Sequence, residues 1–123
     1  MKKFLGLAFG LLLTVFTYAQ SHVTFNDAAS GYDKTAVTTF HFTFDGTFKL
    51  DDLNNNAAYY TDYFSVAVEA KDAGFSVTIT LAQDDEMSRR VITRYMVTNK
   101  VEHVTVNGTD LALDEFMGDY IML

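Results

Sequence analysis

The chain has 123 residues, contains neither cysteine nor proline, and carries a formal net charge of −7. Without cysteine it has no disulfide, no thiol nucleophile and no thiolate ligand for a metal. The excess of acidic residues argues against nucleic acid and anionic membrane surfaces as partners, because basic patches bind both.

Residues 1–19 have the pattern of a secretory signal peptide. Lys2 and Lys3 form a positive start, an apolar run follows from Phe4 to Phe16, and Thr17-Tyr18-Ala19 is a small-x-small cleavage site. The apolar run is shorter than the roughly 20 residues that a membrane span needs. We therefore expect export to a periplasm or to the cell exterior, with no membrane insertion after the signal is removed.

We expect an irregular leader over residues 20–36 and a single domain over residues 37–123. The leader is polar, and His22 to Phe25 is the one segment in it where we expect a short strand. A single domain of this length can bury a substantial core. No internal repeat and no linker divides the domain.

The first clear strand is expected from Val37 to Asp45, where phenylalanines alternate with threonine and histidine. Because successive side chains of a strand point to opposite faces, the phenylalanines line the core face and His41 lies on the other. A helix is expected over residues 50–63, where apolar residues recur at helical spacing. Asn54-Asn55-Asn56 makes this helix the least stable element.

Residues 64–82 form the clearest hairpin of the chain. Two alternating runs are joined by Lys71-Asp72-Ala73-Gly74, a loop of common hairpin length in which Gly74 is able to adopt a positive φ. The opposite face is small and hydroxylated, which predicts a half-buried antiparallel sheet with helices on one side. The apolar face consists of Phe64, Val66, Val68, Phe75, Val77, Ile79 and Leu81.

A second helix is expected over residues 84–99, where an acidic first turn complements the helix dipole. Asp85 with Arg89, and Glu86 with Arg90, have the i,i+4 spacing of ion pairs on a helix surface. We expect each pair to stabilise the helix by about 0.2–0.5 kcal/mol.

The chain ends with an expected strand over residues 101–106, a tight turn at Asn107-Gly108, and an appendix of one short strand and one short helix. The order of the main elements is then β-α-β-β-α-β, which is the split βαβ, or ferredoxin-like, arrangement. We therefore expect an α+β fold with strand order 4-1-3-2 and both helices on one face of an antiparallel sheet.

This order resembles that of heavy-metal-associated domains, the ferredoxin-like modules of copper chaperones and metal-transporting ATPases. Phe42-Thr43-Phe44-Asp45-Gly46 looks like the first strand and glycine of that family. The family then carries two cysteines, and Lys49 and Asp52 stand at those positions here. Lysine and aspartate do not replace two thiolates as ligands of Cu(I). The resemblance thus implies a fold without the metal chemistry of the family.

One set of residues suggests a different metal site. If strand 37–45 lies beside strand 101–106, His41 and His103 both point away from the helices, and Glu69 lies on the same face. Two imidazoles and a carboxylate are suitable ligands for zinc or Cu(II). The alternative is that each histidine is a solvent-facing sheet residue.

The same face carries many hydroxyl side chains and little charge. Such a face is suited to contact with a partner protein or a second copy, although threonine is also common on ordinary solvated sheet faces. No G-x-S-x-G nucleophile motif occurs. We therefore expect a non-catalytic exported module that acts by protein or ligand contact, with metal binding as the alternative. The hydroxyl residues are Thr39, Thr43, Ser65, Ser76, Thr78, Thr80 and Thr105.

Overall fold

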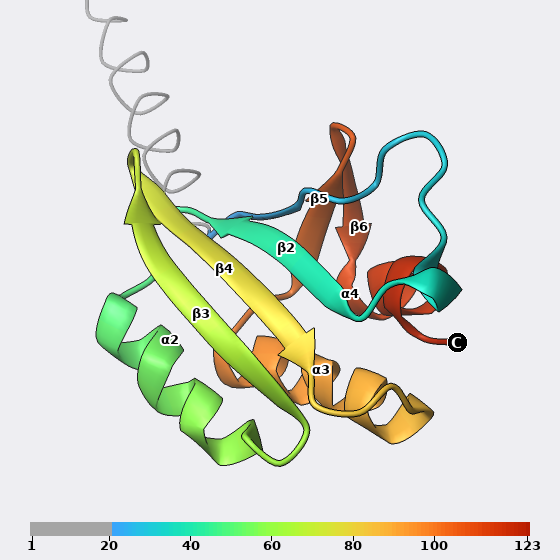
Figure 1. Cartoon of the computed structure of the whole chain (residues 1–123). Helices are drawn as coiled ribbons and strands as arrows, with labels where there is room; N and C mark the ends of the chain where they lie inside the picture. Colours follow the sequence, from blue (N-terminus) through green and yellow to red (C-terminus); the bar gives the residue numbers. More distant parts are fainter. Residues whose placement is uncertain (1–20) are drawn as a thin grey trace, which may run out of the picture.

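The computed structural model describes residues 21–123, so the expected signal peptide lies outside the described residues. The described chain is an α+β domain with a six-stranded, mostly antiparallel sheet in the order β3-β4-β2-β1-β5-β6 (Figure 1). The predicted α+β class is confirmed. The strands are β1 (Val23–Phe25), β2 (Thr39–Phe44), β3 (Phe64–Lys71), β4 (Gly74–Leu81), β5 (His103–Val106) and β6 (Thr109–Ala112).

The helical segments pack on one face of this sheet (Figure 1). Between residues 21 and 123, no helix has the length and apolar character that crossing a bilayer requires. The segments are η1 (Lys34–Ala36), α2 (Leu50–Ala57), η2 (Ala58–Tyr60), α3 (Glu86–Thr98), α4 (Leu113–Phe116) and η3 (Met117–Ile121), of which η1 and η2 are 3₁₀ turns and η3 is a π-helix.

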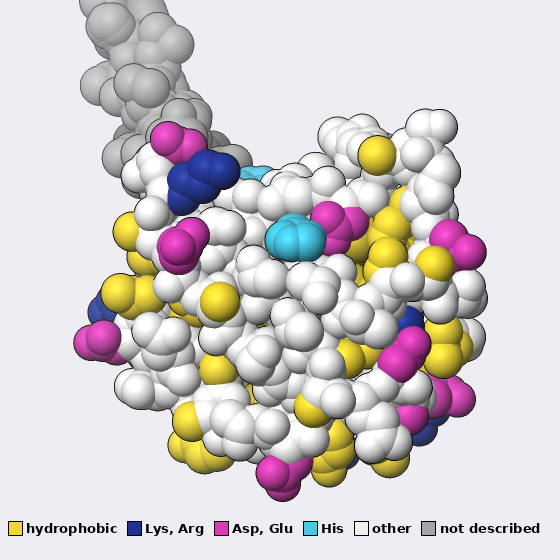
Figure 2. All heavy atoms as spheres, in the orientation of Figure 1, with side chains coloured by type: hydrophobic (Ala, Val, Ile, Leu, Met, Phe, Trp, Pro, Cys, Tyr) yellow, Lys and Arg dark blue, Asp and Glu magenta, His cyan; other side chains and the backbone are white. Residues whose placement is uncertain are grey.

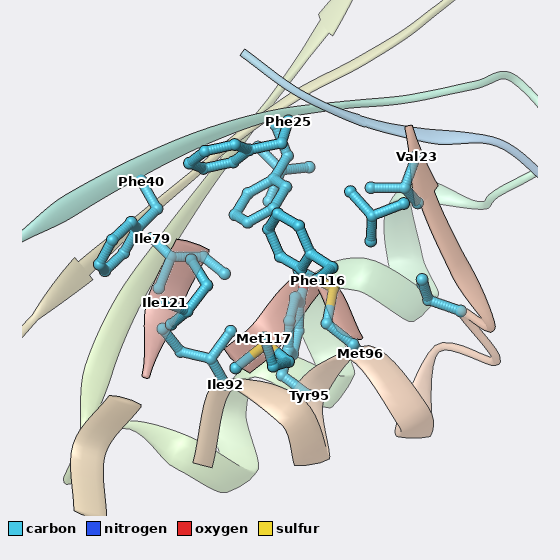
Figure 3. Close-up of a cluster of buried hydrophobic side chains, with 14 of the residues drawn as sticks. Val23, Phe25, Phe40, Ile79, Ile92, Tyr95, Met96, Phe116, Met117 and Ile121 are labelled. Carbon is cyan, nitrogen blue, oxygen red and sulfur yellow. The ribbon is translucent and has the colours of Figure 1, made fainter. Parts of the chain in front are cut away.

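The core lies between the apolar face of the sheet and these helices. Figure 3 shows side chains from the sheet meeting side chains from α3 and from the C-terminal segment. The rings of Phe25 and Phe116 lie 5.1 Å apart, and those of Phe25 and Phe42 lie 5.3 Å apart. The C-terminal α4–η3 segment therefore covers the apolar face, and the opposite face, which we call the open face, stays uncovered by it.

Strand β1 is the main departure from the expected fold. It lies between β2 and β5, antiparallel to the first and parallel to the second. Val23 and Phe25 are buried, at 1% and 3% exposure. We expected the strands at residues 37–45 and 101–106 to be neighbours, and this is wrong because β1 lies between them. The short strand expected at residues 22–25 is present as β1, but it belongs to the sheet rather than to an irregular leader outside the domain.

The central hairpin is confirmed, with a shorter turn than expected. Lys71 pairs with Gly74, so the loop has Asp72 and Ala73 at its tip, and Asp72 rather than Gly74 adopts a positive φ of 53°. Gly74 is required for a different reason. A Cβ atom there would collide with the backbone carbonyl of Phe44 at the end of β2.

The start of α3 corrects one of the two expected ion pairs. The pair of Glu86 and Arg90 forms on the surface, with a distance of 2.8 Å. The Asp85 carboxylate instead caps the helix by accepting the Ser88 amide at 2.7 Å, so its expected pair with Arg89 is wrong. The Arg89 guanidinium turns into the protein, where no part of the side chain is exposed. The guanidinium is buried rather than paired at the surface because three carbonyl groups distant in the sequence and the Asp84 carboxylate accept its hydrogen bonds.

Candidate functional site

Polar side chains form aligned rows across the open face. The strand register places one residue from every strand in a single row, and two shorter rows lie beside it on β3, β4 and β2. Directly opposed side chains of neighbouring strands lie about 4.5–5.5 Å apart, so each row is a near-continuous line of polar groups, with Ala67 as the one apolar member. The long row is Glu69, Ser76, Thr43, Thr24, Thr105 and Asp110; the shorter rows are Ala67, Thr78 and His41, and Ser65, Thr80 and Thr39.

Apart from the Asp27 carboxylate beside His41, the open face is nearly uncharged between its ends. The carboxylates of Glu69 and Asp110 mark the two edges of the long row, and short hydroxyl side chains fill the space between them. Figure 2 shows this face as largely white, with a histidine beside an acidic side chain near its middle. Long charged side chains usually occupy solvated surfaces. Their absence from the middle of this face resembles the composition of interface cores, which are depleted of charge.

The loop after β1 fixes His41 at the centre of the face. The Asp27 carboxylate accepts the His41 amide at 2.8 Å and lies 3.0 Å from the imidazole Nδ1. Asn26 extends the pairing by donating its amide to the His41 carbonyl at 2.9 Å and its side chain to the Thr43 hydroxyl at 2.9 Å. With Nδ1 engaged by Asp27, the Nε2 atom of the half-exposed imidazole is the one left to contact a ligand.

The residues expected to bind metal are not brought together. His41 and His103 lie on strands separated by β1 and on opposite sides of the long row. Two strand spacings and four residues along the strand place their Cα atoms roughly 16 Å apart. Glu69 lies two strands from His41 in the other direction, roughly 12 Å away by the same geometry. His41, His103 and Glu69 therefore do not share a metal ion in this arrangement.

The structure instead places His22 beside His103. Thr24 pairs with Thr105 in the parallel β1–β5 ladder, so the residues two positions earlier are neighbours on the same face. Both histidines line a surface hollow of about 480 Å³ together with Ser21, Lys100, Glu102 and Asp110. His103 Nδ1 lies 3.5 Å from the Asp110 carboxylate.

The neighbouring position of His22 was missed from the sequence because β1 was not expected between β2 and β5. The alternation of His22 and Thr24 with buried Val23 and Phe25 was the available signal. Within residues 21–123, no group of three or more His, Cys, Asp or Glu side chains is arranged to hold a metal ion.

The groups whose pKa values are shifted contribute to packing and helix capping and are not side chains of the open face. Burial raises the pKa of Tyr32 to about 12 and also raises that of Tyr95. Hydrogen bonds from Thr35 lower the pKa of Asp33, and the backbone amide of Ser88 lowers that of Asp85. These four groups serve packing and helix capping, so none of them indicates an acid or base at the open face.

Searches for similarity to protein-family models, to curated proteins and to solved structures found no match to this chain.

Proposed function

We propose that the protein is a small exported, non-catalytic module that acts by contact with a partner protein through the open face. The observation that carries this proposal is the row of uncharged hydroxyl side chains that crosses the sheet in register. The secretory pattern of residues 1–19 supports export.

The chemistry of the face favours contact over mere solvation. Serine and threonine lose less side-chain entropy on burial than lysine or glutamate, so covering this face costs comparatively little. Each hydroxyl both donates and accepts, which suits a partner surface rich in backbone or side-chain polar groups. The engaged Nδ1 of His41 gives the centre of the face a fixed ring orientation. The expected partner is therefore a flat polar surface with few acidic groups.

The test is a quantitative capture of the exported proteins of the source cells on the immobilised mature protein. Thr78→Arg places a long cation in the middle row, whereas Thr61→Arg makes the same change at an exposed loop position away from the sheet. We expect one partner to be retained by the wild type and by Thr61→Arg but lost with Thr78→Arg. If both variants capture the partner equally, the open face is excluded as the contact surface.

We also propose that the fold is a ferredoxin-like split βαβ domain with β1 inserted. The strands β2, β3, β4 and β5, with α2 and α3 between them, follow the order and directions of that arrangement. A relationship to heavy-metal-associated domains would then rest on this topology alone.

Binding of zinc or Cu(II) is a second candidate function, and the placement of His22 beside His103 favours it. The two imidazoles would be ligands, with the Asp110 carboxylate close to His103. The test follows the imidazole NMR signals during titration with Zn²⁺ and Cu²⁺. We expect His103→Ala to abolish the shifts and His41→Ala, a similarly exposed histidine, to preserve them. No shift in the wild type at micromolar metal would end this candidate.

A further inference from the structure

Strand β3 forms one edge of the sheet and, among the described strands, pairs only with β4 (Figure 1). The Tyr63 carbonyl accepts the Ala82 amide at 2.9 Å, and Lys71 opposes Gly74 at the other end of the hairpin. In an antiparallel pair, every second residue exchanges hydrogen bonds with the partner strand and the others point away. The residues whose backbone groups point outward are therefore Phe64, Val66, Val68 and Ala70.

This edge lacks the features that normally prevent pairing with another chain. Proteins protect sheet edges with proline, bulges, inward charges or short strands. β3 has eight residues, pairs with β4 in unbroken register and contains no proline. Its charged residues are Glu69 and Lys71, both near its C-terminal end. The other edge strand, β6, has four residues. β3 is thus the long and unprotected edge.

We propose that β3 pairs antiparallel with β3 of a second copy of this chain, about a two-fold axis that passes beside Ala67. This register opposes Val66 to Val68 of the second copy, and Phe64 to Ala70. The backbone groups of these residues point outward, so the two residues of each pair can exchange both of their N–H···O=C hydrogen bonds. Val66 and Val68 are only half-buried within one copy, and they gain a cross-strand apolar neighbour in the pair.

The charges select this register over its neighbours. On the open face it places Ser65 opposite Glu69 of the second copy, where the hydroxyl donates to the carboxylate. A shift of two residues that moves the axis to Val68 brings the Glu69 side chains of both copies onto a diagonal, where like charges repel. A shift that moves the axis to Val66 shortens the paired segment. The register centred on Ala67 avoids both penalties.

Helix α2, which packs against β3, is compatible with this approach. The Asn56 side chain donates to Asn99 at the end of α3 with a distance of 2.8 Å, so this side of α2 faces α3. At about 100° per residue, Asn54 and Ala58 lie on the opposite side of the helix. They are exposed and uncharged, and Leu50, one turn before Asn54, is 41% exposed. Asp51, in the first turn, is the charged residue on this side of α2. In Figure 1, α3 lies inward of α2, so the side of α2 that faces away from α3 lies toward the β3 edge.

Pairing at β3 would join the two sheets and the two open faces into one surface. This inference does not depend on the function proposed for the open face, because the pairing rests on the outward backbone groups of β3, whereas the proposed contact rests on side chains across all six strands. Failure of the pairing would leave the contact proposal standing, and the reverse also holds.

The test is the molecular mass of the purified mature protein by light scattering across low to high micromolar concentrations. Ala67 is exposed on the open face, and its Cβ atom would lie about 4.5–5.5 Å from its copy across the axis. We expect the wild type to dimerise, Ala67→Glu and Ala67→Lys each to be monomeric, and an equal mixture of the two variants to form a heterodimer. A wild type that stays monomeric at the highest concentration, or a mixture that stays monomeric, would overturn the proposal.

A second variant checks the backbone directly. Val68→Pro removes an amide that points outward and leaves the β3–β4 hydrogen bonds intact. We expect this variant to be folded by circular dichroism and monomeric by light scattering. A folded Val68→Pro protein that dimerises as the wild type does would contradict pairing through β3.

Discussion

Arg89 offers the sharpest test of what holds this fold together. Its guanidinium is fully buried and donates to three backbone carbonyls and one carboxylate from separate parts of the chain. It also lies 5.5 Å from the centre of the Phe40 ring. The acceptors are the carbonyl of Lys34 at 2.8 Å, that of Ile121 at 2.9 Å, that of Val37 at 2.7 Å, and the carboxylate of Asp84 at 2.9 Å.

The substitution Arg89→Met keeps an unbranched side chain over Phe40 but removes every donor. Three carbonyls then lose their partners, and each unsatisfied group costs about 1 kcal/mol or more. The Asp84 side chain is 38% exposed, so water replaces most of its lost contact. We therefore expect a loss of about 3 kcal/mol in the free energy of unfolding. That is a large share of the roughly 5–15 kcal/mol typical of a domain.

Arg90→Met is the matched control. Arg90 is the next residue of the same helix, and its ion pair with Glu86 is 57% exposed on both sides. Exposed pairs of this kind contribute about 0.5 kcal/mol or less. The same chemical change at adjacent positions should therefore differ by more than about 2 kcal/mol.

The assay is equilibrium unfolding in urea followed by circular dichroism. With an m-value of roughly 1.5 kcal/mol/M, the Arg89→Met midpoint should fall by about 2 M urea while the slope stays constant. Amide hydrogen exchange should also accelerate in η3, because the Ile121 carbonyl loses the hydrogen bond from Arg89. If the free energies of unfolding of Arg89→Met and Arg90→Met lie within about 0.5 kcal/mol of each other, the buried hydrogen bonds of Arg89 do not stabilise the fold.

Three other changes test separate parts of the structure. Gly74→Ala should lower the midpoint of thermal unfolding strongly, because the new Cβ atom would collide with the backbone at the end of β2. Gly118→Ala is the control and should leave the midpoint nearly unchanged, because the space around Gly118 is open. The Asp85 carboxylate has a lowered pKa in the folded state, so its stabilising effect is present above about pH 4, the unfolded value, and is lost as pH falls further. Asp85→Asn should therefore remove part of the acid dependence of stability, and an unchanged pH profile would refute this. Tyr95→Phe should cost about 1–2 kcal/mol in urea, because the buried Leu53 carbonyl loses its 3.0 Å hydrogen bond.

The sequence predicted those parts of the fold whose signal is local. Alternation in residues 64–82 and the phenylalanines of β2 identified the core face and the hydroxyl face. The pattern of residues 22–25 predicts a short strand, but three residues in a polar stretch carry too little periodic signal to show that this strand joins the main sheet. Its place beside β5 depends on the packing of Phe25 against Phe116, which are far apart in the chain. The rows of the open face depend on that register, so their alignment was not predictable.

The burial of Arg89 was likewise not predictable from a local pattern. The i,i+4 spacing with Asp85 predicted a surface ion pair, and this rule considers only one helix. The residue is instead fixed by carbonyls from the η1 segment and from the C-terminus. Similarly, the pairing of His41 with Asp27 depends on the path of the loop after β1, which no local pattern specifies.

The most direct test of the contact surface is threonine methyl NMR of the labelled mature protein, recorded before and after addition of the partner captured from the exported fraction. The open face carries reporters such as Thr43, Thr78 and Thr105, whereas Thr61 and Thr98 lie away from it. We predict that the signals of the first group shift or broaden and that those of the second stay unchanged. Changes confined to Thr61 and Thr98 would place the contact elsewhere and contradict the proposed function.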